Sequence, residues 1–142
     1  MQSKRGVAGS TKMTGSGILI DTNIVIALFG GDAAVKSRFS AAPNVWLSAT
    51  VIGELYYGAR NSGRLAENLR RVEEFAAFSA ILSCDGGTAA HYGQIKASLR
   101  AKGTPIPEND IWIAATARQH NLTLVSRDAH FNHVDGLDVA AW

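Results

Sequence analysis

The chain has 142 residues, about one domain, and folding at this length buries roughly two-thirds of the chain's surface. A hydrophobic share of 46% and a charged share of 18% exclude an intrinsically disordered protein. The longest apolar run, Ile24 to Phe29, is far shorter than the roughly 18 residues of a membrane span, so we expect no membrane association. The single cysteine, Cys84, excludes an intrachain disulfide and favours a reducing, cytoplasmic location.

The net charge of +2 is unevenly distributed along the chain. Residues 1–17 contain three basic residues and no acidic ones, whereas the remaining residues contain 11 basic and 12 acidic ones. Net charge therefore neither indicates nor excludes nucleic-acid binding, which must depend on local patches. Residues 1–17 are also rich in Gly, Ser and Thr without hydrophobic periodicity, and we expect a disordered extension or a cloning remnant there. Residues 18–142 are expected to form one domain.

Strands and helices are predicted to alternate along residues 18–142. We expect strands at 18–20, 45–48, 80–84 and 122–126, with a short last strand near 137–140. Thr22 and Asp32 are the predicted caps of two short helices that end near residues 29 and 41. Longer helices are predicted at 49–60, 64–78, 88–102 and 109–120. This alternation predicts an α/β fold with a parallel sheet and helices on both faces.

Four acidic residues are predicted to lie near one edge of that sheet, where α/β proteins bind ligands. Asp21 closes the first strand, Asp128 follows the fourth, Asp110 opens the helix before the fourth, and Glu54 lies on the helix after the second. Clustered carboxylates repel one another unless a cation lies between them. Mg²⁺ or Mn²⁺ suits such oxygen ligands, so the pattern indicates a candidate metal site.

Structural roles compete with this interpretation. Asp21 and Asp110 equally suit helix termini, and by spacing alone a structural role is the more common one. Glu54 is harder to explain in this way, because its neighbours on the helix are apolar. His130 and His133 lie in a predicted loop without a third soft ligand nearby, so we expect solvated or structural histidines. Cys84 ends a predicted buried strand and is expected to be an inert core thiol.

Four segments together resemble the motifs of PIN-domain ribonucleases, in the expected order. They are Ile18-Leu19-Ile20-Asp21-Thr22-Asn23, Glu54 within residues 48–55, Asn109-Asp110-Ile111-Trp112-Ile113-Ala114-Ala115, and Leu124-Val125-Ser126-Arg127-Asp128. The resemblance covers residues 18–142 and is strongest to the VapC type, the toxin half of bacterial toxin–antitoxin pairs. It implies a three-layer α/β/α domain with a central parallel sheet of four to five strands.

The resemblance also implies a Mg²⁺-dependent endoribonuclease that inhibits translation, with Mn²⁺ as a substitute ion. Asp21, Asp110 and Asp128 would hold the ion, and Glu54 would be a further ligand or would orient the attacking water. Asn23 and Ser126 are expected to hydrogen-bond these carboxylates, although ordinary turn and cap chemistry also explains them. Residues 93–106 and Trp142 are similar to the branch that cuts initiator tRNA. Asp128 and Pro107-Glu108 depart from that branch and leave the exact RNA target open.

RNA, an antitoxin protein and a second copy of the chain are the expected partners. Lys96, Arg100, Lys102 and Arg127 are candidate RNA contacts, although such a charge run is usually a solvated face. The helices at 49–60 and 64–78 are predicted to form an antiparallel hairpin. Tyr56 and Tyr57 point about 100° apart on a helix, so one is expected to stay exposed near Glu54 and to suit an amphipathic antitoxin segment.

Two other functions are compatible with parts of this pattern. A phosphohydrolase with an aspartyl nucleophile places a second Asp two residues after the first, and this chain has Asn23 there. A catalytically inactive PIN-like binding module would scaffold a partner without cutting RNA. The presence of all four acidic residues argues against such a module.

Overall fold

The computed structural model describes residues 17–142. The extension expected at the N-terminus therefore lies outside the described residues, except for Gly17. Gly17 packs against the domain, because its carbonyl accepts a hydrogen bond of 3.2 Å from the backbone N–H of Thr123. Within the described residues, no helix combines the length and the apolar character that crossing a membrane requires.

Five parallel strands form one sheet in the order β3-β2-β1-β4-β5. The strands are β1 (Ile18–Ile20), β2 (Val45–Ser48), β3 (Ala80–Leu82), β4 (Thr123–Val125) and β5 (Val139–Ala140). The central strand β1 pairs with β2 on one side and with β4 on the other. Strands β2 and β3 therefore extend the sheet on one side of β1, and β4 and β5 extend it on the other side. Such an arrangement leaves a crevice at the carboxyl ends of the strands, where α/β proteins bind ligands.

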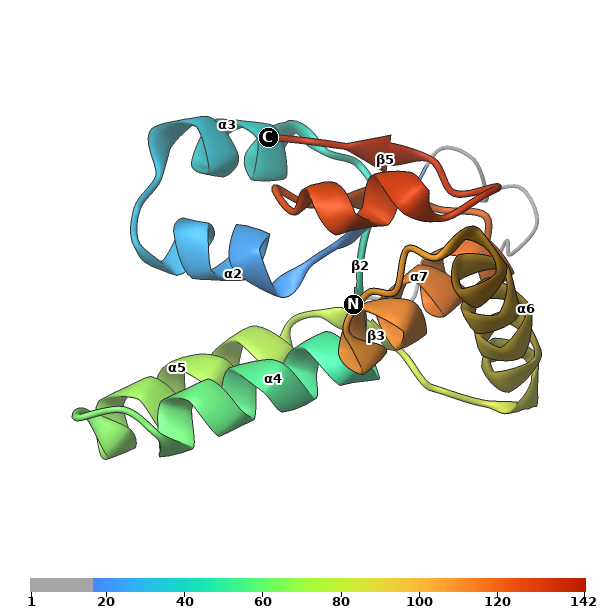
Figure 1. Cartoon of the computed structure of the whole chain (residues 1–142). Helices are drawn as coiled ribbons and strands as arrows, with labels where there is room; N and C mark the ends of the chain where they lie inside the picture. The colour runs from blue at the N-terminus through green and yellow to red at the C-terminus, as the bar shows by residue number, and fades with distance from the viewer. Residues whose placement is uncertain (1–16) are drawn as a thin grey trace.

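Helices flank the sheet on both sides (Figure 1). They are α2 (Thr22–Phe29), α3 (Ala33–Ala41), α4 (Ala49–Arg60), α5 (Leu65–Ala77), α6 (Gly86–Lys102) and α7 (Glu108–Gln119), and a 3-10 helix, η2 (Ala129–His133), follows β4. Figure 1 shows α2 and α3 on one side of the sheet and α6 and α7 on the other, while α4 and α5 form a hairpin. The α/β class, the parallel sheet of up to five strands and the helical hairpin are confirmed.

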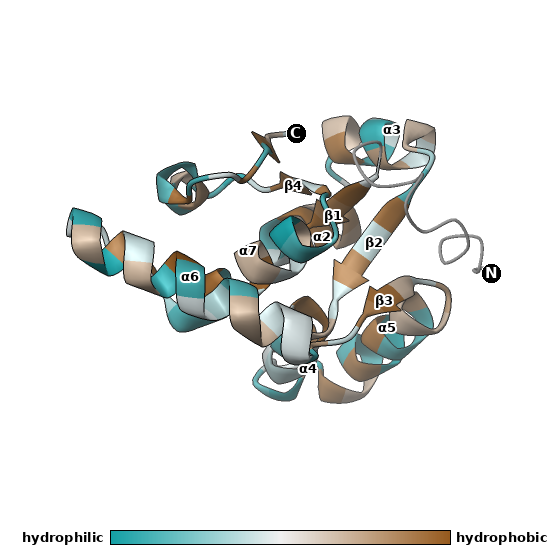
Figure 2. Ribbon diagram, turned by 90° about the vertical axis from the view of Figure 1, so that its right-hand side faces the viewer, coloured by the Kyte–Doolittle hydropathy of each residue, from teal (hydrophilic) through white to brown (hydrophobic). Residues whose placement is uncertain are grey.

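The core lies between the sheet and its helices. Leu19 and Ile20 of β1 are fully buried, as expected for a central parallel strand that is covered on both faces. Helix α7 is buried over most of its surface, and three alanines, Ala114, Ala115 and Ala117, allow it to approach the sheet closely. Figure 2 shows the hydrophobic strands gathered at the centre of the molecule with more polar helices around them. This core fixes the positions of the strand ends that carry the candidate site.

Two local predictions were wrong near β3. Cys84 is exposed, not buried, because β3 is an edge strand that already ends at Leu82. Helix α6 begins at Gly86 instead of residue 88, because Asp85 caps it. The Asp85 side chain accepts a hydrogen bond from the backbone N–H of Thr88, and the Thr88 side chain accepts one from the backbone N–H of Asp85.

Candidate active site

Asp21 is a buried carboxylate between β1 and α2, and only 5% of its surface is exposed. Its Oδ1 accepts a hydrogen bond of 2.8 Å from the backbone N–H of Thr22, so Asp21 caps α2, a role that the sequence assigned to Thr22. Burial raises the pKa of Asp21, and hydrogen bonds from Ser126 and Thr22 partly oppose that rise. The nearby carboxylates of Asp110 and Glu54 raise it further.

Ser126 and Asn23 connect the segment after β4 to the segment after β1. The Ser126 hydroxyl donates to Oδ2 of Asp21 at 2.7 Å and accepts from the backbone N–H of Asp128 at 2.9 Å. The side-chain amide of Asn23 lies 3.4 Å from the same hydroxyl, and its carbonyl oxygen accepts from the backbone N–H of Arg127. These contacts fix the rotamer of Asp21 and the position of the chain before Asp128.

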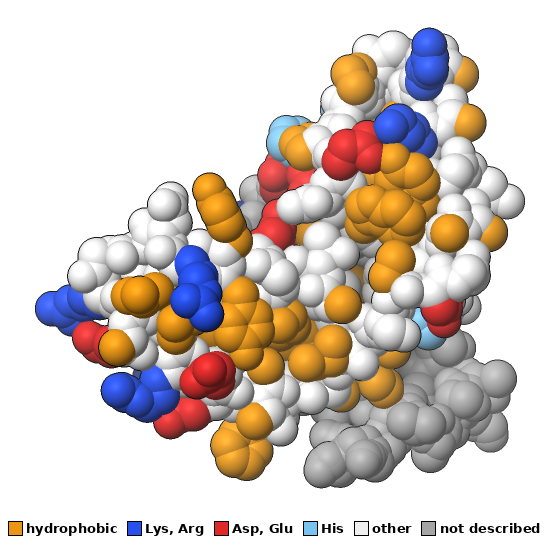
Figure 3. Space-filling model, turned by 90° about the horizontal axis from the view of Figure 1, so that it is seen from below, with side chains coloured by type: hydrophobic (Ala, Val, Ile, Leu, Met, Phe, Trp, Pro, Cys, Tyr) orange, Lys and Arg blue, Asp and Glu red, His pale blue; other side chains and the backbone are white. Residues whose placement is uncertain are grey.

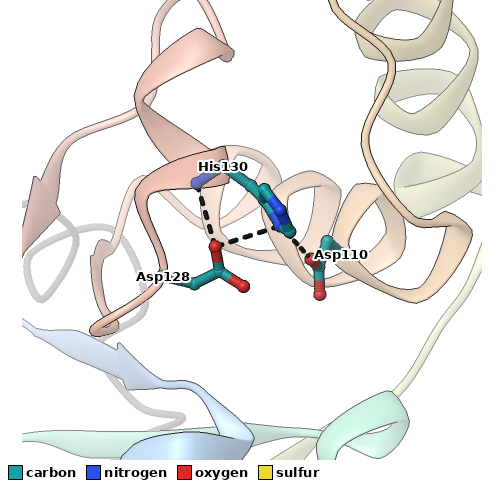
Figure 4. Close-up of side chains that lie close together, drawn as sticks. All are labelled: Asp110, Asp128 and His130. Carbon is teal, nitrogen blue, oxygen red and sulfur yellow. Dashed lines mark hydrogen bonds and ion pairs between the residues drawn. The ribbon is translucent and has the colours of Figure 1, made fainter.

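Asp110 and Asp128 lie on either side of His130 (Figure 4). Asp110 is in the first turn of α7, and Asp128 caps η2 by accepting from the backbone N–H of His130 at 3.0 Å. The Nδ1 atom of His130 is 3.2 Å from Oδ2 of Asp110 and 3.0 Å from Oδ1 of Asp128. Burial raises the pKa of Asp110; the contact with His130 opposes this rise, and the carboxylates of Asp128 and Glu54 add to it.

His130 was missed as a site residue by sequence reasoning. Asp110, Asp128 and His130 each place one ligand atom within 4.8 Å of the others. The residues around His130 form a short 3-10 helix instead of the expected loop, and the fully buried Phe131 anchors that helix in the core. The one available signal was the spacing of two residues between Asp128 and His130, which is too weak to stand alone.

Glu54 reaches the same region from α4. Its Oε1 accepts a hydrogen bond from the Thr22 hydroxyl, and its Oε2 accepts one of 3.1 Å from the side-chain amide of Asn109. Thr22 and Asn109 therefore hold this carboxylate between α2 and α7. Sequence reasoning assigned no site role to either residue, although both lie within its motifs.

A cleft of about 750 Å³ contains the four acidic residues of the site. It opens between α2, α4 and α7, beside the end of β4. Its lining residues are Asp21, Thr22, Asn23, Ile26, Thr50, Gly53, Glu54, Tyr57, Asn109, Asp110 and Asp128. Carboxylates from four separate chain segments thus line one open cleft at the carboxyl edge of the sheet.

Two of the four candidate RNA-binding residues, Lys96 and Arg127, are linked to segments that carry the acidic residues of the site. Lys96 of α6 forms an ion pair of 2.7 Å with Glu108, which begins α7 two residues before Asp110. Arg127, next to Asp128, forms an ion pair of 2.9 Å with Asp32. Both pairs are partly exposed to solvent, so incoming phosphates can compete for these cations.

The other two candidates lie at the end of α6. Lys102 forms an ion pair of 3.0 Å with Asp135 and donates a hydrogen bond to the carbonyl of His133. Arg100 is exposed in the last turn of the same helix. Each of the three ion pairs made by these basic residues therefore has a different acidic partner.

The fold and the site define an α/β domain with an acidic cleft at the carboxyl edge of a parallel sheet. The PIN domain family model matches residues 18–137, and the chain belongs to this family. The family predicted from the sequence is confirmed.

The relatives of the chain include VapC proteins. It is 39% identical over 127 residues to "Ribonuclease VapC2" of Haemophilus influenzae, which covers 87% of this chain and 96% of that protein. It is 34% identical, with the same coverage, to "tRNA(fMet)-specific endonuclease VapC" of Shigella flexneri. Among solved structures it is similar to the DNA-bound VapBC of Salmonella typhimurium, with a TM-score of 0.84, 30% identity and coverage of 89% of this chain and 98% of that one.

Proposed function

We propose that this protein is a metal-dependent endoribonuclease and the toxin of a toxin–antitoxin pair. The observation that carries the proposal is the convergence of Asp21, Glu54, Asp110 and Asp128 on one open cleft. Relatives named as VapC ribonucleases, which match nearly their whole length, support the same activity.

The chemistry of the cleft suits a divalent cation. In the described part of the chain, none of the four carboxylates forms an ion pair with a lysine or an arginine. The raised pKa values of Asp21 and Asp110 reflect charge that is buried without full compensation. Asp21, Asp110 and Asp128, with Glu54, would hold Mg²⁺ or, in its place, Mn²⁺. A bound ion acidifies water and neutralises charge on the scissile phosphate.

Other residues of the chain position the carboxylates of the site. Ser126 fixes the Asp21 carboxylate, and Asn23 supports Ser126. Thr22 and Asn109 hold Glu54, which lines the cleft and would be either a further metal ligand or the acceptor of a proton from the attacking water. The open shape of the cleft admits an RNA backbone, and cleavage of RNA in this way would inhibit translation.

Transfer RNA is the substrate class that we propose first. The support is the name of the Shigella flexneri relative, "tRNA(fMet)-specific endonuclease VapC". We propose that Lys96, Arg100, Lys102 and Arg127 contact the RNA backbone. The ion pairs of Lys96, Lys102 and Arg127 would then exchange their carboxylates for phosphates.

An antitoxin is the proposed protein partner, since the similar structures include VapBC complexes. A second, largely apolar groove of about 380 Å³ adjoins the active-site cleft. Its lining residues are Ile26, Phe29, Gly30, Glu54, Leu55, Gly58, Ala59, Asn68, Arg71 and Val72. Figure 3 shows one face of the molecule, seen from below, on which hydrophobic side chains are exposed with charged side chains around them. An amphipathic antitoxin segment suits this groove, because it would cover apolar surface and reach Glu54 at its end.

We also propose a homodimer that works in the cytoplasm. Trp112 stacks on Tyr92 at a ring distance of 4.1 Å, and both rings are half-buried. The exposed part of this aromatic pair is available to a second copy. Light scattering at micromolar concentration tests the dimer, and a monomer would contradict it.

The test of the proposed function is a nuclease assay on purified tRNA, with Mg²⁺ or with EDTA. The wild type should cut only with the metal, and Asp21→Asn should be inactive. Asp85→Asn is the matched control, because Asp85 also caps a helix but lies outside the cleft, and it should cut normally. Cleavage in EDTA or by Asp21→Asn would exclude the proposal, and the absence of any cleavage would favour the inactive binding module or the phosphohydrolase.

A further inference from the structure

His130 points its Nδ1 atom at two carboxylates that come from different parts of the chain (Figure 4). We propose that this nitrogen is a direct ligand of the metal ion held by Asp110 and Asp128, and that it makes the site prefer Mn²⁺ to Mg²⁺. The inference rests on the proposed metal-dependent function and specifies the ligands and the ion of that site.

The distances among the three side chains suit neighbouring ligands of one ion. Octahedral coordination at about 2.1 Å places adjacent ligand atoms roughly 3.0 Å apart and opposite ones roughly 4.2 Å apart. The Nδ1 atom of His130 lies 3.0 Å from Asp128 and 3.2 Å from Asp110, and all three ligand atoms lie within 4.8 Å of one another. One ion can therefore contact all three with little movement of the side chains.

The surrounding structure holds His130 in this orientation. Asp128 caps η2 through the backbone N–H of His130, and the next residue, Phe131, is fully buried. The His130 side chain is 46% exposed, so an ion and its water ligands can reach it. A neutral imidazole with its proton on Nε2 presents a lone pair on Nδ1.

His133 lies on the same short helix as His130, but only His130 faces the carboxylates. Within residues 17–142, His133 is not part of the group of potential ligands. Its carbonyl oxygen instead accepts a hydrogen bond from Lys102. His133 is therefore a natural control for any general effect of removing a histidine from this helix.

A nitrogen ligand changes the preference of the site for metals. Mg²⁺ strongly favours oxygen ligands and keeps several waters, whereas imidazole is a good ligand for transition metals. A site with Asp110, Asp128 and His130 combines both kinds of donor. Replacing His130 should therefore weaken Mn²⁺ binding more than Mg²⁺ binding.

Binding of Mn²⁺ and Mg²⁺ to the purified protein without RNA tests the inference, by calorimetry and by pulsed electron paramagnetic resonance of bound Mn²⁺. Wild type and His133→Ala should show coupling of Mn²⁺ to a histidine nitrogen, and His130→Ala and His130→Gln should lose it. Both His130 variants should bind Mn²⁺ on the order of 10-fold more weakly, with a smaller change for Mg²⁺. Gln keeps a donor toward the carboxylates, so it separates ligation from hydrogen bonding.

Three results would overturn the inference or its basis. Bound Mn²⁺ without nitrogen coupling in the wild type would exclude His130 as a ligand. Equal weakening of both metals in His130→Ala, restored by His130→Gln, would show that His130 only positions the carboxylates. Failure of the wild type to bind either metal would instead contradict the proposed function itself. Circular dichroism spectra and melting curves establish that each variant is folded.

Discussion

The hydroxyl of Ser126 donates a hydrogen bond of 2.7 Å to Oδ2 of Asp21, and both residues are buried. This contact joins the ends of the neighbouring strands β4 and β1. Between these two strands the strand order changes direction, because β2 and β3 lie on one side of β1 and β4 and β5 on the other. The same hydroxyl accepts from the backbone N–H of Asp128. One side chain therefore couples the positions of two acidic residues that are 107 positions apart in sequence.

Ser126→Ala should lower both the nuclease activity and the stability of the protein. The variant leaves Asp21 free to rotate and raises its pKa further, because the Ser126 hydrogen bond lowers it. We expect activity to fall by roughly 10- to 100-fold, as when other supports of metal ligands are removed. Loss of one buried hydrogen bond destabilises a protein by about 1–3 kcal/mol, which urea unfolding measures. Activity within twofold of the wild type would show that Asp21 is held by other contacts.

Asp21→Asn should stabilise the metal-free protein at neutral pH. Burial raises the pKa of Asp21, so the ionised carboxylate destabilises the fold above that pKa. As pH falls through the raised folded pKa toward the unfolded value, the carboxylate takes up a proton and the destabilisation disappears. The melting temperature of the variant should therefore exceed that of the wild type at pH 7, and the difference should vanish in acid.

With metal present, the wild type should have a higher melting temperature than Asp21→Asn. Mg²⁺ or Mn²⁺ binds only the folded wild type and should raise its melting temperature, whereas Asp21→Asn should respond little. An equal response of the two proteins would remove Asp21 from the metal site. A metal-free variant less stable than the wild type at neutral pH would contradict the direction of the pKa shift.

The order of strands and helices was predictable because the buried strands are short apolar runs separated by amphipathic helices. The approximate meeting of the four acidic residues followed from the rule that ligands bind at the carboxyl edge of a parallel sheet. What the sequence did not reveal depends on local geometry. The five-residue helix η2, which turns His130 toward Asp110, has no hydrophobic period to detect. Cys84 was misplaced because an apolar run does not show that its strand lies at the sheet edge.

Replacement of Lys96, Arg100 and Lys102 by Ala together should weaken RNA binding without weakening metal binding. The ion pairs of Lys96 and Lys102 are exposed and contribute little to stability, so the variant should fold. If all three contact phosphates, the slope of log affinity against log salt should fall by about 2, at roughly 0.7 per contact. Filter binding of tRNA across salt concentrations measures this slope.

Removal of three arginines from the α4–α5 hairpin, Arg60, Arg64 and Arg70, provides the control with equal loss of charge. This control variant should keep the wild-type slope and affinity. An equal loss of affinity in the two triple variants would indicate that net charge alone governs RNA binding. Unchanged affinity of the α6 variant at low salt would remove these three residues from the RNA contact.

Tyr57→Ala should weaken the complex with the antitoxin while the fold survives. Tyr57 is 71% exposed at the rim of the active-site cleft, whereas Tyr56 is half-buried against the core. An exposed aromatic that a partner covers contributes about 2 kcal/mol or more to binding, which is roughly 30-fold in affinity.

Phe78→Ala is the control, because Phe78 is 92% exposed but lines neither groove, and it should bind normally. Calorimetry with the co-expressed antitoxin measures all three affinities. Tyr56→Ala should chiefly lower the melting temperature, and unchanged affinity of Tyr57→Ala would place the antitoxin on another surface.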